Sequence, residues 1–207
     1  MRLTRLLIIA ILIAVAAPSI AQSKQARDKY DAGQREIDRR NGPKAEKLLR
    51  EAIELAPDWM KPRLALGEML TAQHRWEAAA EAWSKARDLD DKNRNDETKR
   101  LGRAQRNILL DSLGVAQGQA GQIDAAIETY TAAIKEDPEY AFFEYNLACA
   151  YAEKHNLDRA LAHLKRAWTL RDNIPSGSRF PDPRKDDSFK RYWNDPQFLD
   201  VVENMVI

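Results

Sequence analysis

The 207-residue chain has little of the chemistry that enzymes and metal sites require. It contains one cysteine and three histidines, and none of the histidines has a Cys, His or acidic residue at a recognised ligand spacing. No glycine-rich phosphate loop, nucleophile elbow or Cys-x-x-Cys motif is present. A lone cysteine cannot form a disulfide within the chain, so packing must stabilise the fold. We therefore expect no catalytic residues, metal or cofactor, and predict that the chain is not an enzyme.

An excess of charge of one sign is also missing. The 33 Lys and Arg residues are balanced by 32 Asp and Glu residues, which gives a formal net charge of +1. Long-range attraction to nucleic acid or to an anionic membrane requires a strong positive field. We therefore expect no nucleic-acid partner.

A long apolar run occurs only at the N-terminus. Two arginines precede an unbroken series of Leu, Ile, Val and Ala from Leu6 to Ala17, and small residues follow it up to Ala21. This is the order of parts in a secretory signal peptide. Because the run is shorter than the roughly 20 residues that span a bilayer, we expect residues 1–21 to be cleaved off, leaving no stable membrane span. The mature chain is then exported, periplasmic or secreted; an uncleaved N-terminal anchor is the alternative.

The sequence does contain a period of 34 residues. Ala45 and Ala79 are 34 residues apart, as are Ala126 and Ala160, and a second alanine ladder keeps the same steps seven residues later. A large residue lies between the two ladders in every unit, so small, large and small side chains share one helix face. An apolar residue followed by a very small one, as at Leu66-Gly67 and Leu147-Ala148, marks a helix before each such face. Each unit is therefore predicted to be a pair of helices.

These residues resemble the tetratricopeptide repeat (TPR), a 34-residue helix-turn-helix unit, and the chain resembles a bacterial exported TPR protein. The resemblance implies an all-α, right-handed superhelical α-solenoid of about four units, with a concave groove formed by the first helix of each unit. In the first unit Gly42-Pro43 lies where the turn is expected to be complete, so we expect a longer first helix or an irregular turn. Within an array over 22–172, the units are expected at about 26–59, 60–93, 107–140 and 141–172.

Members of this family usually hold extended peptides or partner helices in the groove. Some grip a C-terminal carboxylate with a Lys, Asn and Arg set; here Asn146 matches one position, but basic partners are absent, so that mode is not expected. Residues one position away from the buried face of each first helix are the predicted contacts, although packing between neighbouring units explains them equally well. They are Lys61, Leu64, Glu68, Thr71, Asp111, Val115, Phe142, Tyr145 and Cys149.

A basic insertion of 13 residues, 94–106, separates the second unit from the third. Five basic residues against two acidic ones give it a local charge of +3. We expect Asn95 or Asp96 to cap a helix that lengthens the first helix of unit three. A solvated helix face is the favoured interpretation of the charges. The alternative is an anion or partner patch formed by Arg94, Lys99, Arg100, Arg103 and Arg106.

The pattern stops after the fourth unit. A stretch rich in turn formers predicts a loop over 173–186, and 187–207 is predicted to form capping helices, with Asp195-Pro196 starting the last one. Aromatic residues in this tail are expected to cover the apolar end of unit four, since an uncovered terminal repeat would be insoluble. An aromatic ligand-binding patch is the alternative.

These features predict an exported TPR scaffold that binds a protein or peptide, in the assembly or maintenance of an envelope complex. The alternative is a subunit that binds a small molecule, glycan or anionic polymer through the basic insertion and the aromatic tail.

Overall fold

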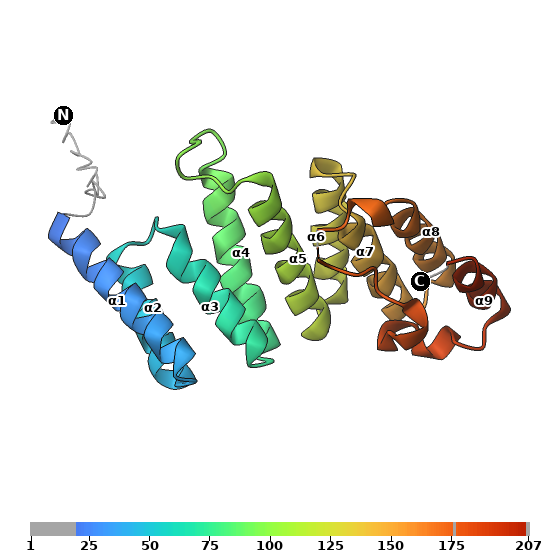
Figure 1. Ribbon diagram of the computed structural model, residues 1–207, viewed down its shortest axis with the longest axis horizontal. Helices are drawn as coiled ribbons and strands as arrows, with labels where there is room; N and C mark the ends of the chain where they lie inside the picture. The colour runs from blue at the N-terminus through green and yellow to red at the C-terminus, as the bar shows by residue number, and fades with distance from the viewer. Residues whose placement is uncertain (1–19, 176, 206–207) are drawn as a thin grey trace, which may run out of the picture.

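The computed structural model describes residues 20–175 and 177–205, and the predicted signal peptide lies almost entirely outside them. The described part is all-α, with helices packed in successive pairs along one long axis (Figure 1), which confirms the predicted solenoid. No helix within the described ranges is long and apolar enough to cross a membrane. The pairs are α1 (Ile20–Asp38) with α2 (Gly42–Leu55), α3 (Met60–Ala72) with α4 (Trp76–Lys92), α5 (Arg103–Gln119) with α6 (Ile123–Glu136), and α7 (Ala141–Glu153) with α8 (Leu157–Thr169).

Each pair is held by a large side chain of its second helix that packs against a small residue of the first. Trp83 of α4 lies against Gly67, and Tyr130 of α6 lies against Gly114. Both rings are 2% exposed, and the alanines of both ladders are buried. Burying one large apolar side chain contributes about 1.5–3 kcal/mol. The 34-residue pattern is therefore the pattern of the core.

The turns between paired helices are alike in all four units. One residue in each turn has a positive φ: Arg40 (59°), His74 (56°), Gly121 (75°) and His155 (60°). These positions follow the steps of the alanine ladders, and α2 begins at Gly42 as far after Gly33 as α4 begins after Gly67. The prediction of an irregular first turn was therefore wrong. The helix α1 has 19 residues, but its extra length lies at its N-terminal end, so Gly42-Pro43 does not reflect a lengthening toward the turn.

Residues 94–102 of the basic insertion form a loop between α4 and α5, and residues 103–106 form the first turn of α5. The helix α4 continues to Lys92 and α5 starts at Arg103, earlier than the repeat period requires, so the first helix of unit three is lengthened as predicted. The predicted caps were wrong, because Gly102 is the residue that precedes α5. Asp96 instead closes a turn in the loop, where its carboxylate accepts hydrogen bonds from the backbone N–H and hydroxyl of Thr98 at 3.0 and 2.6 Å.

The C-terminal segment turns back over the last unit and then covers its end (Figure 1). Its last helix starts as predicted, because the Asp195 carboxylate accepts hydrogen bonds from the first backbone N–H groups of that helix. Phe189 and Phe198 stack at 5.5 Å and are fully buried together with side chains of α7 and α8. The elements of this segment are η1 (Arg171–Asn173), η2 (Pro183–Lys185), η3 (Asp187–Tyr192) and α9 (Pro196–Glu203).

Two glycines of α5 give a direct test of this packing. An added Cβ at Gly114 would collide with the ring of Tyr130, whereas a Cβ at Gly118 would meet no atom within 4 Å. We expect Gly114→Ala to lower the free energy of unfolding by about 1–3 kcal/mol through overpacking. Gly118→Ala in the same helix should raise it by about 0.5–1 kcal/mol because alanine favours helix. Urea unfolding measures both, and equal effects of the two substitutions would contradict the close approach.

Candidate partner-binding groove

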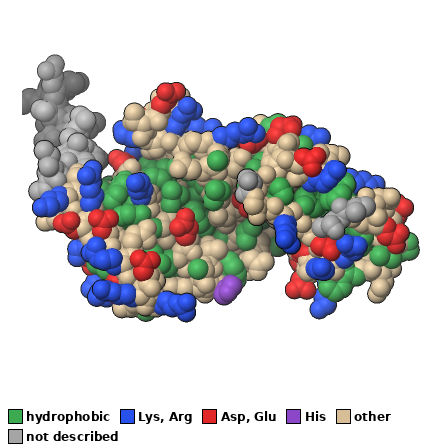
Figure 2. Space-filling view, viewed as in Figure 1, with side chains coloured by type: hydrophobic (Ala, Val, Ile, Leu, Met, Phe, Trp, Pro, Cys, Tyr) green, Lys and Arg blue, Asp and Glu red, His purple; other side chains and the backbone are tan. Residues whose placement is uncertain are grey.

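The first helices α1, α3, α5 and α7 follow one another in this order along the array (Figure 1). Contacts join α1 to α3 and α5 to α7, besides those within each pair. Figure 2 shows apolar side chains gathered on one face over α1, α3 and α5, with charged side chains mostly around them. We call this face the groove. It is the candidate site because its apolar side chains are not all used in the core.

The most exposed large hydrophobic side chain of the described residues lies in the groove. Ile108 of α5 is 55% exposed. It occupies the place in its unit that Lys61 and Phe142 occupy in theirs, and Phe142 is half-buried beside Tyr140. The predicted contacts did not include Ile108, although its distance of 47 residues from Lys61 repeats the step between the alanine ladders and would have identified it.

The predicted contacts on α3 differ in exposure and in whether they already bond to other residues of the chain. Lys61 and Glu68 are exposed and Leu64 is half-buried. The hydroxyl of Thr71 accepts a hydrogen bond of 3.0 Å from the indole N–H of Trp83, so it serves the packing of its own pair. Three of the four α3 residues therefore remain available to a partner.

Asp111 lies on α5 in the middle of the groove. Its carboxylate accepts a 2.7 Å hydrogen bond from the Asn146 side chain of α7, and it forms no ion pair with any described residue. Burial raises the pKa of Asp111 to about 6, and the bond from Asn146 offsets only part of the shift. The asparagine that matched a carboxylate-binding position is thus engaged by a carboxylate of the chain itself.

Tyr145 and Cys149 were predicted to face an open groove, and this was wrong for Tyr145. The C-terminal segment buries Tyr145 and contacts Cys149, which stays half-buried. The Tyr145 hydroxyl donates a 2.9 Å hydrogen bond to Asp186, and the Cys149 sulfur lies 3.6 Å from the same carboxylate. Burial and the Asp186 charge raise the pKa of the Cys149 thiol well above its usual value. The rings of Phe180 and Phe189 meet Tyr145 edge to face at 5.6 and 6.3 Å.

This closure could not be seen in the repeat pattern, because the contacts join residues about 40 positions apart. The predicted loop over 173–186 therefore has a structural role, and the aromatic tail is part of the core around α7 and α8 rather than an exposed patch. The open part of the groove runs over α1, α3 and α5 and continues beside α7 only as the hollow lined by Val115, Asn146, Cys149 and Glu153.

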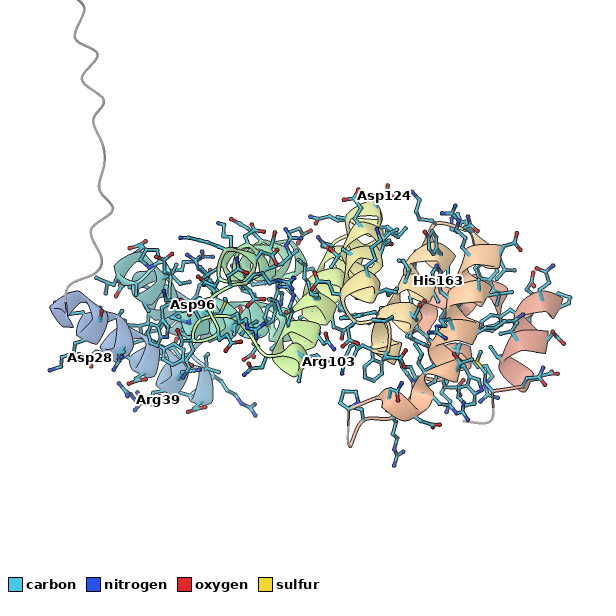
Figure 3. The ribbon with its side chains drawn as sticks, turned by 90° about the horizontal axis from the view of Figure 1, so that it is seen from above. Asp28, Arg39, Asp96, Arg103, Asp124 and His163 are labelled. Atoms are coloured by element: carbon cyan, nitrogen blue, oxygen red, sulfur yellow. The ribbon has the colours of Figure 1, made fainter. Side chains whose placement is uncertain are left out.

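The five basic residues of the insertion do not form a free cationic patch. Every one is paired with an acidic side chain of the same chain. Figure 3 labels one member of two such pairs: Asp96, the partner of Lys99, in the loop, and Arg103, the partner of Asp137, at the start of α5. The Arg103 guanidinium holds both oxygens of Asp137 at 2.7 Å and lowers the pKa of that carboxyl to about 2. The other pairs are Arg94 with Glu136, Lys99 with Asp96, Arg100 with Glu97, and Arg106 with Asp90, Asp91 and Glu136.

The start of α5 joins the second unit to the third. Arg106, with only 10% of its side chain exposed, pairs with Asp90 at the end of α4 and with Glu136 at the end of α6 at 2.7 Å. Asp90 is 1% exposed and also accepts a 2.6 Å hydrogen bond from the Leu101 backbone. Asp137, at the equivalent place 47 residues later, receives Arg103. The first turn of α5 thus binds the end of the second unit, at Asp90, and the end of the third unit, at Glu136 and Asp137.

Removing the Arg106 side chain should therefore destabilise the whole array. Arg106→Met leaves the buried Asp90 carboxylate without its cation, and breaking such a pair costs about 3–5 kcal/mol. Arg100→Met is the matched control, since its partner Glu97 is 85% exposed and an exposed pair is worth about 0–1 kcal/mol. Urea unfolding gives both free energies, and similar losses for the two variants would contradict the role of Arg106.

Comparison with known proteins agrees with this geometry. The tetratricopeptide repeat model matches residues 30–94 and 112–175, on either side of the insertion. No curated protein matches the sequence. Among solved structures, MamA MSR-1 is similar with 21% identity and a TM-score of 0.57 over 72% of this chain and 78% of that chain. MamA AMB-1 is similar with 20% identity and a TM-score of 0.58 over 73% and 75%. These likenesses show the fold, and the repeat matches show that the chain belongs to the tetratricopeptide repeat family.

Proposed function

We propose that this chain is an exported scaffold that holds a protein partner in the open part of its groove. The observation that carries the proposal is the contrast between the two ends of the groove. At α7 the chain covers its own aromatic residues, so that Tyr145 is 2% exposed. At α5 it leaves Ile108 exposed, and at α3 it leaves Leu64 half-buried. Apolar surface that the fold leaves uncovered is typical of an interaction site.

The shape of this surface favours a protein over a small molecule. A small ligand is usually enclosed over most of its surface in one pocket. The groove instead carries two hollows of about 660 and 530 Å³ beside α5, one lined by Ile108 and Tyr140 and the other by Val115 and Asn146. Such a series of hollows along parallel helices suits an extended segment or a partner helix.

The ion pairs weigh against the alternative of anion binding. That alternative depends on the charge of the insertion, and the pairs with Asp90, Asp96, Asp137 and their neighbours neutralise it. Export is supported by the signal-like pattern of residues 1–21. A role in the assembly or maintenance of an envelope complex rests on that export.

Photocrosslinking in intact cells tests the proposal. A benzoylphenylalanine at position 64 or 108 should form an adduct with the same protein in the envelope fraction, because both positions face the open groove. The matched control places it at exposed Glu128 on α6, outside the groove, and should not capture that protein. Mass spectrometry identifies the adducts. An identical set of adducts from all three positions, or none from the groove positions, would contradict the proposal.

A further inference from the structure

We propose that the partner segment carries a lysine or arginine flanked by apolar residues, and that this basic residue docks on Asp111. The inference rests on the proposed function and names the chemistry of its partner. Three properties of the groove support it: a carboxylate without a cation, apolar surface on both sides of that carboxylate, and a negative charge around it.

The missing cation is unusual for this chain. Three of the four buried carboxylates of the described residues pair with a Lys or Arg, and the fourth, Glu144, lies 2.7 Å from the His163 ring, which is a cation only when protonated. Asp111, although half-buried, has only the neutral amide of Asn146. A desolvated carboxylate without a cation is costly, and a cation that arrives with a partner recovers that cost. The paired carboxylates are Glu36 with Lys44, Asp90 with Arg106, Asp137 with Arg103, and Glu144 with His163.

Apolar side chains lie on both sides of Asp111 along the helix. Ile108 precedes it by three residues and Val115 follows it by four, so all three share one face of α5. Ile108 lines the hollow of about 660 Å³ and Val115 the hollow of about 530 Å³. Asp111 therefore lies between two hollows that suit the apolar neighbours of a basic residue.

The surroundings of Asp111 are acidic. The hollow beside Val115 is lined by Glu153 and Asp186 and by no Lys or Arg. In the other hollow the cation, Arg103, is taken up by both oxygens of Asp137. On the neighbouring α3, desolvation raises the pKa of Glu68, which forms no ion pair with any described residue.

Lys61 is the basic residue among the predicted groove contacts on α3. Lys61, in the first turn of α3, is seven residues and therefore about two helical turns away from Glu68 along that helix. The middle of the groove thus attracts a basic side chain and repels an acidic chain terminus.

Selection from a random peptide library displayed on phage tests the inference on the full chain. The wild-type chain should enrich peptides with a Lys or Arg beside apolar residues. Asp111→Asn should lose that preference for basic residues, and Glu128→Gln, which removes an exposed charge on α6, should keep it. Thermal unfolding followed by circular dichroism verifies that both variants are folded.

The outcomes separate the two proposals. Peptides that are enriched but show no preference for basic residues, or a preference that survives in Asp111→Asn, would overturn the docking of a cation on Asp111 and leave the groove as a binding site. No enrichment by the wild-type chain would overturn both the inference and the proposed function.

The affinity of one selected peptide measures how strongly Asp111 contributes to binding. A synthetic copy is compared with a copy that has norleucine in place of its basic residue, which keeps the apolar stem and removes the charge. Asp111→Asn should weaken the basic peptide by about 10- to 100-fold, as expected for a charged hydrogen bond, and leave the norleucine peptide within about twofold. Equal weakening of both peptides would show that Asp111 acts only through the shape of the groove and would overturn the proposal.

Discussion

The structure depends on one constraint, which is that every helix pair has an apolar face that only its neighbour can cover. The close approach of Trp83 to Gly67 and of Tyr130 to Gly114 joins the two helices of these pairs, and the buried alanines of both ladders lie on the same helix faces. The last pair has no following pair, so another segment must cover its apolar face. At its C-terminus the chain does this with Phe189 and Phe198, which are fully buried.

The same ending determines where a partner has room to bind. To reach the far end of unit four, the C-terminal segment passes along α7, and Asp186 and Phe180 engage Tyr145 on the way. This part of the groove is occupied by the chain itself. What stays open is the surface over α1, α3 and α5, with Ile108 as its most exposed apolar side chain. The C-terminal segment thus both covers the end of the array and limits the surface that a partner can bind.

The repeat could be predicted from the sequence because its determinants are local. The residues that form one helix face, and the small residue that meets them, all lie within one 34-residue unit, and the period made them visible. The insertion and the tail could not be predicted in the same way. Arg103 meets Asp137 34 residues away, and Tyr145 meets Asp186 41 residues away. Composition left a basic patch open as the alternative to a solvated helix face, because it counts charges without their partners. Asp111 was predicted as a groove residue, but its lack of a cation appears only in three dimensions.

Thiol accessibility tests the central claim that the groove is closed at α7 and open at α3. The rate of reaction with Ellman's reagent is measured for Cys149, the only thiol of the chain, and for a thiol placed by Leu64→Cys in a Cys149→Ala background. We expect Cys149 to react more slowly by about tenfold or more, since a half-buried thiol whose pKa is raised beside Asp186 supplies little accessible thiolate. Similar rates for the two thiols in the folded chain would contradict it.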